Sequence, residues 1–569
     1  MDHLDLQQLA AVKSPHPNTL VIAGAGSGKT RVLVERIAYL IKHRKTSPTE
    51  ILAITFTRKA AGEMTRRLEK RLGARDAHRL RIGTIHAVAL RYIRMWGDSL
   101  GFRPSTVTVY GDWEEKFLMV DTAKLVKAKP GYKGAVEKYY QTGNAPEPDD
   151  PHDRFFKVFM NRLRSNNSMT YGMLLANMKA LVPEITNRPL KHILVDEAQD
   201  LDTLQWHIIQ YLQSLSGCAV FAVGDIDQSI YAWRGAVPAY LLSLSSSYEV
   251  FKLESNYRSA TVVVAAANAL IKHNGRRIEK TMHPHRQDPG RLVVKTDMDS
   301  AAVAAYLREL QDKHGSVAVL SRAHVLLVKL SQELAELGVA HHYCGQKGRI
   351  MQSEEFRRAH AVFKLIVNPH DQFSFALARP HLGIDDLQYL AILEDAGKNY
   401  TSHVESWLKL HADEHWVSVF SEGKAWPLSR VVEYLIGTIP GPDFAAPAEI
   451  ALGFAAHNAK LRDYLDWVAT FDLQEEVQDP GQAGIQLMTV HAAKGLEFPV
   501  VVIVGLNEGI LPSKQAISAG DVEEERRLAY VAMTRAEDFL ILCVRPEKSE
   551  SNGKAYTNPP SRFLNEVEL

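Results

Sequence analysis

A glycine-rich segment near the N-terminus constrains the fold of this chain more than any other feature. The segment reads AGAGSGKT over residues 23–30, and it lies between the apolar run Thr19–Ala23 and a helical pattern that begins near Arg31. Glycines let backbone N–H groups close around phosphates at a helix N-terminus, which requires a strand before the loop and a helix after it. The segment therefore predicts a nucleoside-triphosphate site on a parallel α/β sheet.

The residues of this loop have separate expected roles. Lys29 would reach the β- and γ-phosphates, and the hydroxyl of Thr30 would ligate Mg²⁺. The strict form of the pattern begins with glycine, whereas this chain has Ala23 at that position. The residues that we expect to bind ATP here are Ala23, Gly24, Ala25, Gly26, Ser27, Gly28, Lys29, Thr30 and Arg31.

Two acidic residues follow a second apolar run, Ile193–Val195. Asp196 at the end of this run can hold the Mg²⁺ shell, and Glu197 can polarise the attacking water. An acidic pair after a strand is by itself often only a helix N-terminal charge. Together with the upstream phosphate loop, the pair predicts a hydrolytic site.

Apolar runs that are followed by polar or glycine-rich loops fall into two sets, which predict two parallel sheets. The first set is 19–23, 51–54, 192–195 and 219–223, and the second is 317–320, 485–488, 500–504 and 539–543. Largely helical stretches separate the runs. We expect two P-loop-type α/β lobes that each carry a helical insertion. The first lobe comprises residues 1–95 and 190–260, with its insertion at 96–189. The second lobe comprises residues 261–384 and 481–569, with its insertion at 385–480.

The length of 569 residues fits several compact units, and no apolar run reaches the roughly 18 residues of a membrane span. The N-terminus lacks a signal peptide, and the three cysteines are isolated, which favours a cytoplasmic protein that does not bind a membrane. The net charge is only +1, but residues 42–104 hold 15 Lys or Arg against 5 Asp or Glu. This stretch could contact phosphates or could simply be solvated helix faces.

The order of the remaining motifs resembles that of the UvrD/Rep/PcrA branch of superfamily 1 helicases. TFTRKAA at 55–61 is similar to the family's TFTNKAA, with Arg58 in place of asparagine, and VGDIDQSIYAWRGA at 223–236 is similar to VGDDDQSIYSWRGA. The other matching segments are LDLQQLAAV at 4–12, GTIH at 83–86, DEAQD at 196–200, NYRS at 256–259, TVHAAKGLEF at 489–498, EERRLAYVAMTRA at 524–536 and SRFL at 561–564.

This resemblance implies roles for further residues. Gln8 would read adenine, Tyr257 would stack on it and Glu497 would approach the sugar. Arg258 and Arg535 would act as arginine fingers, and we assign Gln228 to sensing the γ-phosphate. Trp233 would be the moving contact that stacks on a base. The other residues expected to contact DNA are Phe56, Thr57, Thr84, His86, Tyr231, Arg234 and His491, and both histidines could equally be structural.

The resemblance implies an ATP- and Mg²⁺-dependent motor that moves 3′ to 5′ on single-stranded DNA or at junctions in repair or replication. An alternative is an ATP-hydrolysing, DNA-sensing subunit that regulates a partner, such as a nuclease of an anti-phage complex. An RNA-directed motor is a weaker alternative. The insertion at 385–480 is shorter than the family's usual 2B subdomain, which leaves open whether the chain unwinds DNA or strips proteins from it. Because the chain ends soon after Phe563, we expect no fused nuclease.

Overall fold

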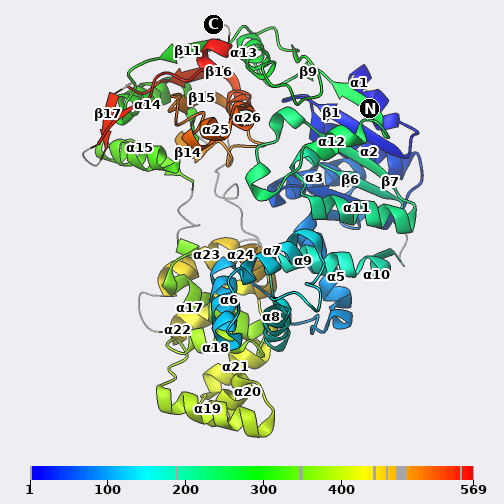
Figure 1. Cartoon of the computed structure of the whole chain (residues 1–569), viewed down its shortest axis with the longest axis vertical. Helices are drawn as coiled ribbons and strands as arrows, with labels where there is room; N and C mark the ends of the chain where they lie inside the picture. The colour runs from blue at the N-terminus through cyan, green and yellow to red at the C-terminus, as the bar shows by residue number, and fades with distance from the viewer. Residues whose placement is uncertain are drawn as a thin grey trace. The chain divides into compact units, whose positions relative to one another are not determined.

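The computed structural model describes residues 3–186, 190–344, 350–439, 444–455, 459–469, 484–546, 548–551 and 554–567. The chain forms two compact units (Figure 1). The first contains residues 1–85, 188–345 and 472–569, and the second contains residues 86–187 and 346–471. Within the described residues, no helix is both long enough and apolar enough to cross a bilayer.

The first sheet of the larger unit has six parallel strands in the order β3-β2-β6-β7-β1-β8. The strands are β1 (Asn18–Ala23), β2 (Ile51–Thr55), β3 (Arg81–Thr84), β6 (His192–Val195), β7 (Ala219–Gly224) and β8 (Glu249–Leu253). The helices of this half are α1 (Leu6–Lys13), α2 (Lys29–Lys42), α3 (Arg58–Leu72), α4 (Ala74–Ala77), α11 (Thr203–Ser216) and α12 (Ala239–Leu244). Because parallel strands end at one edge, the loops after β1, β6 and β7 meet there.

The second sheet is also six-stranded and parallel, in the order β11-β16-β15-β12-β14-β13. Its strands are β11 (Arg291–Lys295), β12 (Ser316–Ser321), β13 (His341–Tyr343), β14 (Gly484–Thr489), β15 (Phe498–Val504) and β16 (Ala536–Cys543). Its helices are α13 (Thr261–Ile271), α14 (Ser300–His314), α15 (His324–Glu336), α25 (Lys514–Ala519), α26 (Val522–Met533) and α27 (Phe563–Glu566). The expected fold class, with two parallel-sheet lobes, is confirmed.

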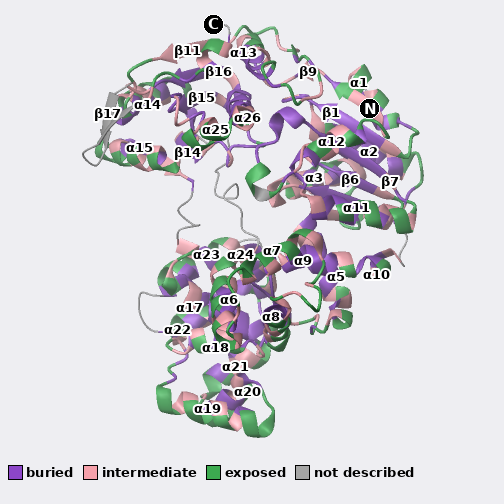
Figure 2. Ribbon diagram, in the orientation of Figure 1, coloured by how far each residue is buried: buried purple, intermediate pink, exposed green. Residues whose placement is uncertain are grey.

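Near-continuous apolar strands place the core of each half on both faces of its sheet, as the purple strands of Figure 2 show. One core cluster combines residues of the second sheet, such as Leu320 and Met488, with Ala25 and Tyr231 from loops of the first. The two halves of this unit therefore share buried apolar surface next to the phosphate loop. Small additional pairings are β9 (Ser255–Asn256) with β10 (His283–Pro284), and β17 (Lys548–Ser551) with β18 (Lys554–Thr557).

The second unit is mainly helical. Its first segment holds α5 (Ile85–Trp96), α6 (Asp112–Val126), α7 (Tyr132–Thr142), α8 (Asp153–Ser165), α9 (Met173–Ala180), α10 (Val182–Thr186), and the pair β4 (Thr108–Tyr110) and β5 (Ser168–Thr170). Its second segment holds α17 (Glu354–Val367), α18 (Gln372–Ala378), α19 (Asp386–Asn399), α20 (His403–Leu410), α21 (Glu414–Glu422), α22 (Leu428–Thr438), α23 (Ala445–Ala455) and α24 (Leu461–Ala469).

Buried polar contacts join the two segments of the helical unit. The amide of Asn368 donates to the carbonyl oxygen of Asn166 at 2.8 Å, and Lys364 forms an ion pair with Glu114 at 2.6 Å. These contacts lie in and just after α17, so residues 346–384 group with the helical unit, although the sequence placed them with the second lobe. The residue boundaries of the four-part division stay a prediction.

Candidate nucleotide site and nucleic-acid contacts

The phosphate loop connects β1 to α2, as the sequence predicts. Gly26 and Gly28 have φ angles of 69° and 84°, in the left-handed region that glycine adopts without strain. Gly28 directly precedes α2, so the loop opens onto the helix N-terminus, where backbone N–H groups lack intrahelical partners. An added Cβ at Gly24 would lie 1.8 Å from the Met282 sulfur, so the Met282 side chain would have to move to admit a larger residue. This backbone geometry suits an anionic ligand.

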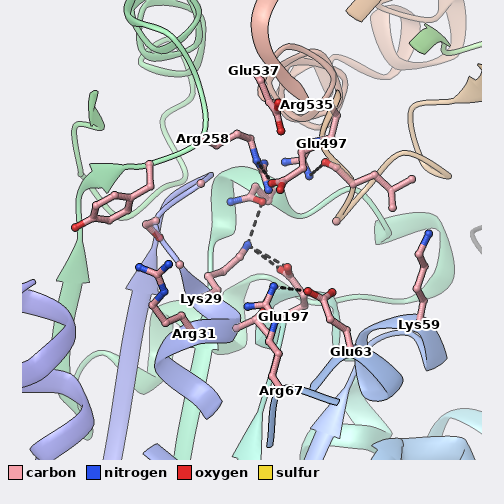
Figure 3. A pocket seen from close by; sticks show the side chains of 18 of the residues that line it. Lys29, Arg31, Lys59, Glu63, Arg67, Glu197, Arg258, Glu497, Arg535 and Glu537 are labelled. Atoms are coloured by element: carbon pink, nitrogen blue, oxygen red, sulfur yellow. Dashed lines mark hydrogen bonds and ion pairs between the residues drawn. The ribbon is translucent and has the colours of Figure 1, made fainter. Parts of the chain in front are cut away.

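Three side chains from different loops meet at the entrance of α2. The Lys29 ammonium lies 3.1 Å from a carboxylate oxygen of Glu197 and donates to the amide oxygen of Gln228 at 3.0 Å. Figure 3 shows Lys29 and Glu197 pointing toward each other. The structure thus brings together the lysine expected to bind phosphate, the expected base and the expected sensor.

The adjacent carboxyl groups of Asp196 and Glu197 differ in their surroundings. Burial raises the pKa of Asp196, and the nearby charge of Glu197 raises it further. Burial also acts to raise the pKa of Glu197, but the charges of Lys29 and Lys494 and a hydrogen bond from Gln199 outweigh it and leave that pKa lowered. Glu197 therefore stays ionised, as a residue that polarises water must be.

The donor set at this position suits Mg²⁺. Asp196 is 5% exposed, and its carboxylate accepts a backbone N–H from Glu197 at 3.0 Å. A divalent cation would offset the cost of this buried negative charge, and hard carboxylate and hydroxyl oxygens are the ligands that Mg²⁺ prefers. Thr30, which lines the cleft together with Glu197, can supply the hydroxyl.

The two expected arginine fingers, Arg258 and Arg535, both line the cleft. Arg258 donates from Nε to Glu497 at 2.7 Å and from Nη1 to the carbonyl oxygen of Thr534 at 3.1 Å. Arg535 is 2% exposed and donates to the carbonyl oxygens of Val531 and Leu496. Burial lowers the pKa of Arg535. A cation held by neutral carbonyl groups keeps its charge available to an anion in the cleft.

The residues expected near adenine lie around the start of the chain. Tyr257 lines the cleft, and its hydroxyl donates to Asp5 at 2.6 Å. Gln8 is fully buried. Its amide oxygen accepts the backbone N–H of Asp5 in the capping box of α1, and its amide nitrogen donates to the carbonyl oxygen of Ser27 at 3.0 Å. In this structure Gln8 therefore supports the phosphate loop, and its role in reading adenine stays a prediction.

The cleft around these groups has a volume of about 880 Å³. Sequence reasoning missed several of its lining residues, including Lys59, Glu63, Arg66 and Arg67 on α3, which is drawn in part in Figure 3. Lys59 lies within the motif at 55–61, and the other three follow it on the same helix, so their helical spacing was the available signal. The basic residues lining the cleft are Lys29, Arg31, Lys59, Arg66, Arg67, Arg258 and Arg535, which suit a polyphosphate.

Four of the expected DNA-contacting side chains form an aromatic cluster. The Tyr231 ring lies 4.8 Å from that of Phe56, 5.9 Å from that of His491 and 6.4 Å from that of Trp233, and its hydroxyl donates to the His491 carbonyl oxygen. Tyr231 is 4% exposed, whereas Trp233 is 67% exposed. Trp233 is therefore the member of this cluster best placed to stack on a base.

The other expected DNA contacts are placed differently. Thr57 caps α3, since its hydroxyl oxygen accepts the N–H of Ala60, and Thr84 ends β3. His86 belongs to the helical unit, where its ring stacks on that of Tyr171 at 4.2 Å. The Arg234 side chain lies outside the described part of the chain. The DNA roles of these four residues stay predictions.

A buried lysine that sequence reasoning missed connects the nucleotide cleft to the aromatic cluster. Lys494 forms an ion pair with Asp200 and donates to the carbonyl oxygen of Gln228 at 2.6 Å. Its ammonium also lies 5.0 Å from the centre of the Tyr231 ring, which favours a cation–π contact. Gln228, the expected sensor, and the aromatic cluster thus contact the same buried lysine.

Comparison with known proteins extends over most of the chain. The UvrD/REP helicase N-terminal domain matches residues 4–249, and the UvrD-like helicase C-terminal domain matches residues 251–422 and 456–546. The ATP-dependent DNA helicase PcrA of Leuconostoc citreum is 28% identical over 642 residues, which cover 99% of this chain and 84% of the relative. PcrA of Staphylococcus aureus strain Mu50 is 28% identical over 638 residues, which cover 100% and 86% of the two chains.

Proposed function

Because this chain belongs to the UvrD-like helicase family, we propose that it is an ATP-dependent helicase or translocase that moves 3′ to 5′ on single-stranded DNA. The observation that carries the proposal is the meeting of Lys29, Glu197 and Gln228 in one cleft. The curated relatives are named ATP-dependent DNA helicases, in agreement with this chemistry. Its setting in repair or replication, its cytoplasmic location and any protein partner stay predictions.

In the proposed reaction each group of the cleft has one task. Lys29 and the loop N–H groups hold the phosphates, and Glu197 accepts a proton from the attacking water. Arg258 and Arg535 stabilise the charge that develops on the phosphates, a contribution that can reach about 10³- to 10⁵-fold in rate. Thr30 and Asp196 would hold Mg²⁺, which neutralises phosphate charge when bound.

Movement along DNA requires that hydrolysis changes the grip on a base. Gln228 lies between the two sites, because its side chain contacts Lys29 and its carbonyl oxygen contacts Lys494 beside the Tyr231 ring. A change in the phosphate contacts of Gln228 would therefore reach the aromatic cluster through packed, buried groups. We assign the base-stacking contact of the motor to Trp233.

The experiment that tests this function is ATP hydrolysis by the purified protein without nucleic acid, with single-stranded DNA and with single-stranded RNA of the same sequence. We expect strong stimulation by DNA and little by RNA. Lys29→Ala should abolish hydrolysis while leaving the thermal unfolding curve close to that of the unaltered protein. An ATP hydrolysis rate that neither DNA nor RNA changes would refute the proposal that the protein is a nucleic-acid motor.

Polarity needs a separate measurement. Displacement of streptavidin from either end of a biotinylated DNA strand reports the direction of movement, and we expect faster displacement from the 5′ end. Partial duplexes with a 3′ or a 5′ tail then report strand separation. Movement without unwinding would make the chain a translocase, and displacement only from the 3′ end would reverse the assigned direction.

A further inference from the structure

A segment outside the assigned motifs contacts the phosphate loop, the turn that carries Gln228, and α26. Residues 272–282, here called the strap, connect α13 to β10. At one end, Asn274 donates to the carbonyl oxygen of Glu523 at 3.0 Å and accepts from Arg526 at 2.6 Å, which ties the strap to α26. At the other end, Met282 is buried against Gly24 of the phosphate loop.

Between these ends, Lys280 enters the turn that carries Gln228. Its side chain is 2% exposed, and its ammonium donates to Asp225 at 2.6 Å and also forms an ion pair with Asp227. Arg277 of the strap donates to Asp227 at 2.8 Å. Two cations of the strap therefore balance two buried aspartates, as buried charges require.

The same aspartate determines how the amide of Gln228 is oriented. The second carboxylate oxygen of Asp225 accepts from the Gln228 side-chain nitrogen at 2.6 Å, and the Gln228 amide oxygen accepts from Lys29 at 3.0 Å. An ionised carboxylate can only accept, and an ammonium can only donate. The amide nitrogen must therefore face Asp225, and its oxygen must face Lys29 and the cleft.

We propose that Lys280 is a positioning residue of the ATP site, which holds Asp225 and through it aims the Gln228 amide oxygen at Lys29. The relay Lys280–Asp225–Gln228–Lys29 is continuous, and its first three members are buried. Without Lys280, Asp225 would lose the cation that it pairs with. The side-chain amide of Gln228 would then lose its fixed orientation. The proposal rests on the function proposed above, because it assigns Gln228 to the hydrolytic cycle.

Electrostatics agree with this geometry. Burial acts to lower the pKa of Lys280, but Asp225 and Asp227 outweigh it and raise that pKa above its usual value. Lys280 is therefore charged at neutral pH. Since α26 ends two residues before Arg535, the strap also connects Gln228 to the helix that precedes this expected arginine finger.

The test is DNA-stimulated ATP hydrolysis by Lys280→Met, alone and in a Gln228→Ala background. Misplacing a group at an active site costs up to about 100-fold, so we expect kcat to fall about 10- to 100-fold with the KM for ATP changed less than about threefold. In the Gln228→Ala background the same substitution should cost less than about twofold, because its target is gone. Equal losses in both backgrounds would overturn the proposal.

Two further variants complete the design. Lys252 is an exposed lysine that donates to the carbonyl oxygen of Glu279 in the strap at 2.7 Å, so Lys252→Met is a matched control that should leave kcat unchanged. If Lys280→Met does not fold, Lys280→Met with Asp227→Asn removes one cation and one anion and keeps the charges balanced. Unchanged kcat in this folded double variant would also overturn the proposal. Failure of DNA stimulation in the unaltered protein would instead refute the proposed function.

Discussion

Replacing Trp233 by alanine should separate ATP hydrolysis from movement along DNA. The indole is 67% exposed, and it rests edge-on against the His491 ring at 6.1 Å. Tyr231, at 4% exposed, holds the cluster from within. The substitution therefore removes a surface available to a base and leaves the packed part of the cluster in place.

The size of the effect follows from stacking energies. A base stacked on an aromatic side chain gains about 1–3 kcal/mol, so losing one stack should weaken single-stranded DNA binding by roughly 5- to 150-fold. An exposed side chain contributes little to folding, and the free energy of unfolding should change by less than about 0.5 kcal/mol. At saturating DNA, ATP hydrolysis should remain close to that of the unaltered protein, because no cleft residue changes.

The assay combines fluorescence anisotropy with an oligothymidine strand, ATP turnover at saturating DNA, and the number of base pairs opened per ATP. Tyr211→Ala, which removes a 38% exposed ring from α11, is the matched control and should behave like the unaltered protein. If Trp233→Ala binds DNA and unwinds with unchanged efficiency, the stacking role of this indole is wrong.

Three further predictions concern other side chains. Glu197→Gln should lower kcat by about 10²- to 10⁴-fold while ATP still binds, as titration with a fluorescent ATP analogue would show; an unchanged kcat would exclude Glu197 as the base. Burial raises the pKa of Glu115 from 4.5 to about 7, so its neutral form stabilises the folded state at low pH and this contribution is lost as the pH rises through 7. Glu115→Gln should therefore raise the free energy of unfolding by about 2 kcal/mol at pH 8 and by little at pH 4. Equal changes in the free energy of unfolding at both pH values would contradict this prediction. Gln486 of β14 is 2% exposed, and neither atom of its side-chain amide has a hydrogen-bond partner among the described atoms. Gln486→Met should therefore increase the free energy of unfolding, measured in urea, by about 1–3 kcal/mol. A decrease would reveal a partner for the amide.

The amino-acid sequence alone determined the parts of this protein that depend on local pattern. Apolar runs predicted the central strands, because a buried parallel strand needs apolar residues on both faces. The glycines at 26 and 28 predicted the phosphate loop, and both adopt the left-handed backbone that favours glycine. The acidic pair at 196 and 197 followed its strand as expected.

Only the tertiary structure decided which distant groups meet. Lys494 pairs with Asp200, 294 residues away along the chain, and Lys280 reaches Asp225 from outside any assigned motif. Likewise, Asn368 joins the two segments of the helical unit by a hydrogen bond to the carbonyl oxygen of Asn166, 202 positions earlier in the chain. A lysine or asparagine carries no periodic signal of its future partner, because the cost of burying it is offset only when the folded chain supplies the opposite charge or acceptor.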